Sequence, residues 1–218
     1  MNRCTLFANR RHRLYDACMD QLGRAFASIE VVDSGDQSDE ALVCREADLV
    51  VSFLSDRILR GPALELENVN FHPAPPSFAG RGSASYALFE GSPIYGATAH
   101  RMVQDIDAGE ILLVEEFPIK ADDTCESVFA QGEQACIVLL EQLVSYIIEH
   151  GELPPPNGRR WARRAATRKD FQEWLMLDPS DEEGFHRKIK AARHSKFPGP
   201  YVRIHGQLFA LSNEEDVS

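Results

Sequence analysis

Several patterns that would assign a chain to a particular class are missing from this sequence of 218 residues. Its five cysteines are scattered and show no Cys-x-x-Cys spacing, which argues against a zinc site or a disulfide framework and fits a reducing cytosol. No apolar stretch is long enough to cross a membrane or to form the core of a signal peptide. We therefore expect a soluble, cytoplasmic protein with no membrane partner and no bound metal.

Basic residues are also few, since 23 lysines and arginines face 34 aspartates and glutamates and leave a net charge of −11. A protein that binds a polyanion by neutralising phosphates normally carries a basic face, so we expect no nucleic-acid partner. One local run, residues 159–169, is rich in arginine and contains no acidic residue. It is either a solvated linker or strand surface, or a contact for the phosphates of a small substrate or an acidic partner chain.

The order of apolar segments predicts the fold class. Strand-like runs alternate with segments of helical spacing in the first quarter of the chain, and the run at residues 48–53 is mostly apolar without alternation, as in a parallel strand buried on both faces. This βαβ alternation predicts an α/β fold with a mostly parallel sheet. The expected elements are a strand at 4–8, a helix at 14–26, a strand at 29–32, a helix that begins at Ser38 or Asp39, and the strand at 48–53.

The next strand carries polar residues in an apolar setting. Asn70 and His72 are two residues apart, so on a strand their side chains project from the same face. Pro73 restricts His72 to extended backbone, which places both residues where a strand ends and a loop begins. Ligands of open α/β sheets bind beyond the carboxyl ends of strands. Alternatively, Asn70 caps a turn and His72 is a surface histidine.

Two further segments follow in order. Residues 96–100, Gly-Ala-Thr-Ala-His, belong to a strand expected at 97–102, and Asp107 with Gly109 follows it. Aspartate and glycine are favoured in tight turns, so this second segment is equally consistent with a plain turn between two strands.

In this order the segments resemble the folate-dependent formyltransferases, in which Asn-x-His-Pro is followed by a Gly-x-Thr-x-His strand and then by Asp-x-Gly. The resemblance spans roughly residues 47–117. The Asn-Phe-His-Pro segment at 70–73 and the Phe-Pro-Ile strand at 117–119 are similar to segments of the nucleotide-sugar N-formyltransferases. The first strand lacks the glycine-rich loop of the glycinamide ribonucleotide enzymes, which weighs against a purine-pathway substrate.

The resemblance implies a Rossmann-like formyltransferase domain with 10-formyltetrahydrofolate as the formyl donor. The residues that it implies are Asn70, His72 and Asp107 for catalysis, Ser52, Leu54, Ile58, Leu59 and Asp105 for donor binding, and Arg81 and His100 for substrate binding. His100 is alternatively a packed neighbour of the site.

The chemistry of formyl transfer fits these residue types. The reaction passes through a tetrahedral oxyanion, which an amide such as Asn70 and an imidazolium such as His72 can stabilise by hydrogen bonds. A carboxylate at Asp107 would hold His72 in its charged form or relay the proton of the amine. The resemblance favours a nucleotide-linked amino sugar as acceptor. The alternatives are another small amine such as hydroxyornithine, a 10-formyltetrahydrofolate hydrolase, and a folate-binding module without catalysis.

The last third of the chain divides at a proline-rich spacer. A long amphipathic helix is expected at residues 124–149, capped by Asp123 or Thr124. Residues 1–151 then form the catalytic domain, and residues 152–218 form a linker and a small C-terminal α+β subdomain. There we expect a helix at 181–191, strands at 201–204 and 207–211, and a disordered tail around 214–216. This part is too small for its own core, so it packs on the main domain or forms a homodimer contact.

Overall fold

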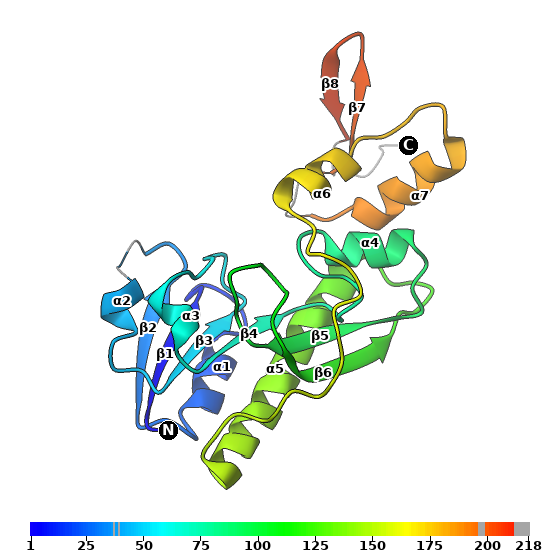
Figure 1. Cartoon of the computed structure of the whole chain (residues 1–218). Coiled ribbons are helices and arrows are strands. Elements are labelled where there is room, and N and C mark those ends of the chain that lie inside the picture. Colours follow the sequence, from blue (N-terminus) through cyan, green and yellow to red (C-terminus); the bar gives the residue numbers. More distant parts are fainter. Residues whose placement is uncertain (37, 39, 196–198, 212–218) are drawn as a thin grey trace.

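The computed structural model describes residues 1–36, 38, 40–195 and 199–211, and its body is one six-stranded sheet with helices on both faces (Figure 1). Two of the expected features, the Asp39 cap and the tail at 214–216, lie outside the described residues. The elements are β1 (Arg3–Ala8), α1 (Tyr15–Leu22), β2 (Ser28–Asp33), α2 (Glu40–Val43), β3 (Leu49–Phe53), α3 (Pro62–Glu65), β4 (Asn68–His72), α4 (Ser83–Phe89), β5 (Ile94–His100), β6 (Ile111–Pro118), α5 (Cys125–His150), α6 (Arg168–Trp174), α7 (Glu182–Ala192), β7 (Tyr201–Ile204) and β8 (Gln207–Ala210).

The strand order is β2-β1-β3-β4-β5-β6, and the first four strands run parallel. Strands β5 and β6 are added antiparallel to β4 and to each other. The predicted α/β class with a mostly parallel sheet is therefore confirmed. β3 is buried along its whole length, which explains why its sequence is apolar without alternation except at Ser52.

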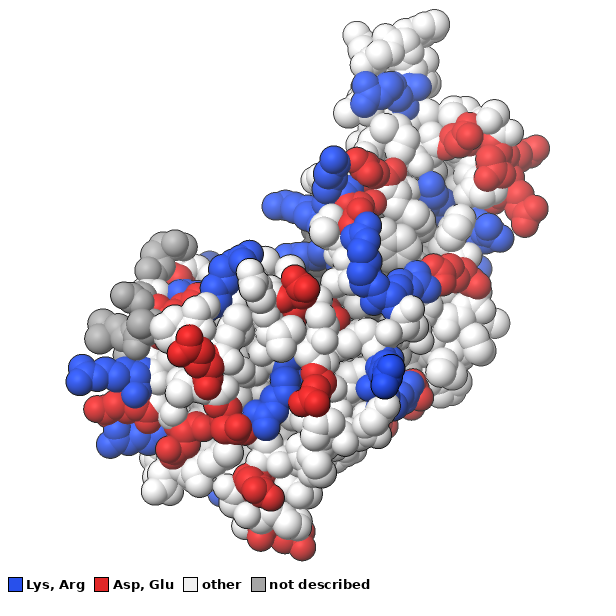
Figure 2. Space-filling view, viewed as in Figure 1, with Lys and Arg blue, Asp and Glu red and all other residues white. Residues whose placement is uncertain are grey.

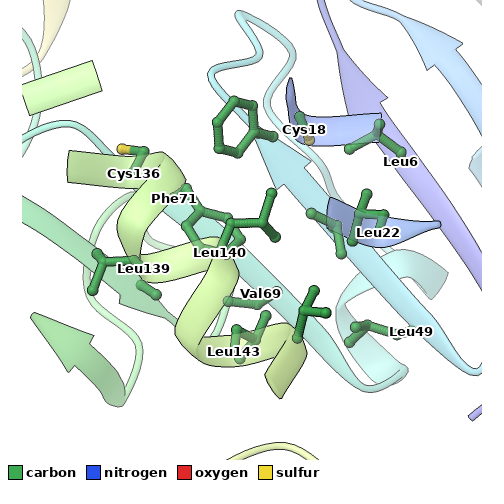
Figure 3. Packing of buried hydrophobic residues seen from close by; sticks show 14 of the residues in the cluster. Leu6, Cys18, Leu22, Leu49, Val69, Phe71, Cys136, Leu139, Leu140 and Leu143 are labelled. Atoms are coloured by element: carbon green, nitrogen blue, oxygen red, sulfur yellow. The ribbon is translucent and has the colours of Figure 1, made fainter. Parts of the chain in front are cut away.

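Helix α5 covers one face of the sheet and forms the main core with it (Figure 3). Its leucines at 139, 140 and 143 pack over Val69 and Phe71 of β4, and Cys18 and Leu22 of α1 complete the layer. The Thr124 hydroxyl accepts a hydrogen bond from the Ser127 N–H at 3.1 Å, and the Ser127 hydroxyl is the partner of the Thr124 N–H. This capping box confirms the expected start of the helix.

After α5 the chain returns across the sheet as an extended strap, which we define as residues 157–166. The Asn157 N–H donates to the Ile111 carbonyl at 2.9 Å, and the Ala162 N–H donates to the Pro76 carbonyl at 3.1 Å. Farther along, Gly80 and Ala166 form a bridge between backbones. The strap therefore lies against β6 and against the loop that follows β4.

The C-terminal part packs against α4, away from β1 and β2 (Figure 1). Tyr86 and Phe89 of α4 pack against Trp174 of α6, with ring centroids 4.9 and 5.5 Å apart. The helix expected at 181–191 and the pair of strands expected near 201 and 211 are present as α7, β7 and β8. The division at residue 151 stays a prediction.

Three details differ from the expected elements. The strand with His100 ends there rather than continuing to residue 102, because Met102 leaves the sheet and its N–H donates to the side chain of Asn68. The short helices α3 and α6 were not predicted, since four and seven residues are too few for a periodic pattern. A signal for α6 was present in the capping box of Thr167 and Asp170.

Candidate active site

The pairing of β4 with its neighbours brings the predicted polar residues to one face. In the antiparallel register Asn70 lies opposite His100, and His72 lies opposite Thr98. On the other side Ser52 of β3 lies opposite Asn70. Residues that pair across strands share a face, so Asn70, His72 and His100 project to the same side, as the spacing predicted for Asn70 and His72. The opposite side carries Phe71 and faces α5.

Asp107 reaches this face from the turn between β5 and β6. Its φ of 45° is left-handed, a conformation that aspartate tolerates better than most residues. Gly109 is required two residues later, because a Cβ there would overlap the carbonyl oxygen of Arg101. The Asp-x-Gly segment is thus a turn between two strands, which was one of its two interpretations. The turn also directs the Asp107 carboxylate toward the site.

The carboxylate of Asp107 lies between two imidazoles. Its Oδ2 is 3.3 Å from Nδ1 of His72, and its Oδ1 is 3.3 Å from Nε2 of His100. The Gly80 N–H also donates to Oδ2 at 2.8 Å. Asn70 completes the group, with its amide nitrogen 3.1 Å from Nε2 of His100. Four residues from three separate segments therefore form one connected cluster.

The electrostatics of the cluster favour the ionised carboxylate. Burial alone raises the pKa of Asp107, but the neighbouring His72 and His100 and the N–H of Gly80 outweigh burial, so that this pKa lies well below its usual range. The side chains of His72, His100 and Asp107 are 10%, 3% and 6% exposed. An anion is thus held in a nearly dry environment by two imidazoles.

The hydrogen-bond partners indicate how protons are arranged. Nε2 of His72 lies 3.1 Å from the Phe78 carbonyl, and Nδ1 faces Asp107, so both nitrogens face acceptors. Only the imidazolium can donate to both. Nδ1 of His100 lies 2.8 Å from the Arg101 carbonyl, and its Nε2 lies 3.3 Å from Asp107 and 3.1 Å from the Asn70 amide nitrogen. His100 thus links the carboxylate to the amide.

The residues expected to bind the donor lie in β3, in the segment that follows it and in the turn that carries Asp107, at different depths. Ser52 and Leu59 are buried, Leu54 is half-buried, and Ile58 is 50% exposed. Asp105 is exposed in the same turn as Asp107. Ile58 and two exposed apolar residues of the β5–β6 loop, Val103 and Ile106, lie outside the core.

Leu54 has a φ of 48° immediately after β3. For a leucine this backbone costs of the order of 1–3 kcal/mol, and such strain is concentrated at functional sites. Its position at the carboxyl end of a parallel strand, beside β4, is where a ligand of an open sheet binds.

Arg81 and the basic run are engaged with acidic residues. Arg81 is exposed, and its guanidinium lies 3.6 Å from Asp56. Within the run, Arg159 pairs with Glu116, Arg163 with Glu90 and Arg164 with Asp170. Figure 2 shows basic side chains over the front of the molecule, where the strap passes toward the C-terminal part. These ion pairs attach the strap to the rest of the chain. Whether the basic run also contacts a phosphate stays a prediction.

Trp161 is a site residue that the sequence did not reveal. It belongs to the strap, and its ring lies against the imidazoles of His100 and His72. It is more than fifty residues from the nearest motif and stands among arginines, so no local pattern linked it to the site.

Two features are absent from the part of the chain that the structure describes. In residues 1–36, 38, 40–195 and 199–211, no group of three or more His, Cys, Asp or Glu is arranged to hold a metal ion. Within the same part of the chain, no helix combines the length and the apolarity needed to cross a membrane.

Comparison with known families gives a match over the region that holds these residues. The family model described as formyl transferase matches residues 30–142. Among curated proteins the chain is similar to the GDP-perosamine N-formyltransferase of Brucella melitensis biotype 1, with 24% identity over 169 residues, which cover 75% of this chain and 64% of that protein. It is similar to the methionyl-tRNA formyltransferase of Bacillus mycoides, with 32% identity over 183 residues, 82% of this chain and 57% of that one. The chain thus spans less than two thirds of these relatives.

Solved structures share the fold over nearly the whole chain. A sugar N-formyltransferase from a Shewanella species has a TM-score of 0.77 at 17% identity, over 97% of this chain and 96% of that one. The N-formyltransferase from Helicobacter canadensis, solved in complex with folinic acid and dTDP-3-aminofucose, has a TM-score of 0.67 at 15% identity, over 94% and 85%. At these identities the similarity establishes a common α/β fold.

Proposed function

We propose, from the premise that this chain belongs to the formyl transferase family, that it moves a formyl group from 10-formyltetrahydrofolate to the amine of a nucleotide-linked amino sugar. The observation that carries the proposal is the cluster at the end of β4, where Asp107 lies 3.3 Å from both His72 and His100 beside the Asn70 amide. In this proposal Asn70, His72 and Asp107 are the catalytic residues.

In the proposed reaction the acceptor nitrogen forms a bond to the formyl carbon, and the bond from that carbon to N10 of the folate then breaks. The acceptor nitrogen loses one proton and N10 gains one, so the reaction needs no oxidant and no covalent enzyme intermediate. The oxyanion between these steps is stabilised by the free N–H of Asn70 and by His72, each typically worth a few kcal/mol. Since Nε2 of His72 donates to the Phe78 carbonyl, that bond opens when the substrate arrives.

The donor side of the proposal rests on the strand ends next to the cluster. The folate would lie against Ser52, Leu54, Ile58 and Leu59, with Asp105 at the rim of the β5–β6 turn. The complex of the Helicobacter neighbour with folinic acid supports a folate donor for this fold.

The acceptor is the finer step of the proposal. The Brucella relative is named for GDP-perosamine, and the Helicobacter neighbour was solved with dTDP-3-aminofucose. The Bacillus relative is named for methionyl-tRNA and is the more identical one, so methionyl-tRNA is the second candidate. A net charge of −11 and a basic strap whose arginines are largely paired both disfavour a large polyanion. Arg81 and His100 would contact the smaller acceptor.

We propose in addition that the protein is a homodimer joined through its C-terminal hairpin. Ile204 and Phe209 share one face of β7–β8, and each is 49% exposed. A two-stranded hairpin alone is marginally stable in water, so this apolar face needs a cover. Residues 201–211 contain no acidic side chain, although the chain as a whole has a net charge of −11. Two copies can therefore pair through this hairpin with little repulsion between acidic side chains.

The deciding experiment measures tetrahydrofolate released from 10-formyltetrahydrofolate with a panel of acceptors. The panel contains nucleotide-linked 3- and 4-amino sugars, hydroxyornithine, glycinamide ribonucleotide and methionyl-tRNA. Turnover with an amino sugar alone supports the proposal, and turnover with another member assigns that acceptor instead. Release of tetrahydrofolate without any acceptor would identify a hydrolase. Folate binding without release under every condition would identify a binding module.

A further inference from the structure

Trp161 lies against the cluster although it belongs to none of the three motifs. Its ring centroid is 4.9 Å from that of His100, with the planes at 89°, and 6.0 Å from that of His72, with the planes at 63°. Its indole N–H donates to the Gly109 carbonyl at 2.8 Å. One side chain therefore touches both imidazoles and the turn that carries Asp107.

The backbone holds this indole from both sides. Before Trp161 the strap is bonded to β6 through Asn157, and directly after it the Ala162 N–H donates to the Pro76 carbonyl. The flanking Arg159 and Arg163 form ion pairs with Glu116 and Glu90. Trp161 is thus fixed in place rather than carried on a free linker.

Each imidazole can rotate about the bond that joins the ring to its Cβ. Each ring has a nitrogen 3.3 Å from Asp107, and this rotation would break that contact. An edge-to-face aromatic contact restrains the plane of a ring, and an indole also stabilises a neighbouring cation. Excluding water strengthens the ion pair by lowering the local dielectric constant.

We propose that Trp161 is a positioning residue, which holds His72 and His100 facing Asp107 and shields that carboxylate from water. Its kinetic consequence rests on the proposed function, whereas its contacts with the rings do not. The charged groups around the rings are Asp107 for both and Arg101, the chain neighbour of His100, whose guanidinium pairs with Glu67.

The first test is kinetic and uses the full chain with the acceptor that turns over. We expect Trp161→Ala to lower kcat by about tenfold or more and to shift its pH profile, with the KM of the acceptor nearly unchanged, because the rings lose their fixed planes. Trp161→Phe restores the ring without the N–H and should recover part of the rate. Trp174→Phe, in the aromatic cluster with α4, is the matched control and should behave as the unaltered protein. An unaltered kcat and pH profile in Trp161→Ala would overturn the proposal.

The second test needs no turnover. The chain has two tryptophans, so in Trp174→Phe the fluorescence comes from Trp161 alone. An imidazole that touches an indole quenches its emission, so at a fixed, neutral pH the emission should rise when His72 and His100 are both replaced by Asn. Unchanged emission in that variant would contradict the contact. If no acceptor turns over at all, the proposed function fails, and this comparison still decides the role of Trp161.

Discussion

At the residue scale, Asp107 has to remain charged while almost fully buried. Its pKa is lowered in the folded protein, so its interactions stabilise the fold above the pKa of an ordinary aspartate, about 3.9, and that contribution is lost as the pH falls toward its folded pKa. The stability of the protein should therefore fall below about pH 4 in part because of this one group.

Asp107→Asn should remove both effects. An amide cannot hold His72 as an imidazolium, so we expect kcat to fall by about 10²-fold or more. The free energy of unfolding at pH 7 should fall as well, and its decline between pH 5 and 3 should be shallower than in the unaltered protein. Steady-state kinetics and chemical denaturation at several pH values measure the two quantities.

Asp122→Asn is the matched control, because that aspartate is exposed and lies between β6 and α5, away from the cluster. It should change neither kcat nor the decline of the unfolding free energy between pH 5 and 3. If Asp107→Asn retained a near-normal rate, Asp107 would have no part in the mechanism.

The sequence predicted these residues unevenly, for physical reasons. Asn70 and His72 were identifiable because a two-residue spacing on a strand fixes a common face. The nearness of Asn70 and His100 came from the antiparallel register of β4 and β5, which a sequence states only indirectly. Trp161 was missed because its position depends on where the strap crosses the sheet.

At the scale of elements, the β5–β6 turn depends on a glycine. A Cβ on Gly109 would overlap the Arg101 carbonyl, and the Gly109 carbonyl accepts from Trp161. Gly109→Ala should therefore displace the turn, destabilise the fold by about 1–3 kcal/mol and lower the midpoint of thermal unfolding by several degrees. The rate should fall as well, because Asp107 moves with the turn.

Gly35→Ala is the control for this substitution, since a Cβ there meets nothing within 4 Å. Its unfolding midpoint should stay close to that of the unaltered protein. Equal midpoints for both variants would show that the turn accommodates a side chain.

The start of α5 gives a second prediction at this scale. Thr124→Ala removes the hydroxyl that accepts from the Ser127 N–H, which should cost about 1 kcal/mol and lower the unfolding midpoint by about 2–4 °C. Thr124→Ser keeps the hydroxyl and should be nearly neutral. Differential scanning calorimetry of the two variants decides whether the cap contributes, and a loss in both would assign the effect to the methyl group instead.

Helix length explains which elements were predictable. Helix α5 has 26 residues and a continuous apolar face, so its period and cap could be recognised directly. Helix α6 has seven residues and packs through Phe171 and Trp174 onto Tyr86, a long-range contact that no local pattern contains. Its capping box was the available signal.

At the scale of the whole molecule, the C-terminal part was expected to be too small for its own core, and the contacts agree with that expectation. Its aromatic residues pack on α4, and Lys188 lies over the ring of Trp174 at 5.3 Å. The hairpin beyond them remains exposed, with Leu208 57% accessible. What covers such a face is decided in the assembly, and the apolar face together with the absence of acidic side chains at 201–211 favours a second copy of this chain.

The homodimer prediction addresses that surface. Phe209→Glu places a charge on the face that carries Ile204. The symmetric interface would then bury two carboxylates, one from each copy, so the dimer should dissociate to a monomer. Ala210→Glu adds the same charge on the opposite face of the hairpin and should leave the dimer intact. Sedimentation equilibrium at micromolar concentration measures both masses. An unaltered protein that sediments as one chain, or two variants that dissociate equally, would contradict this interface, and the hairpin would then need another partner to cover Phe209.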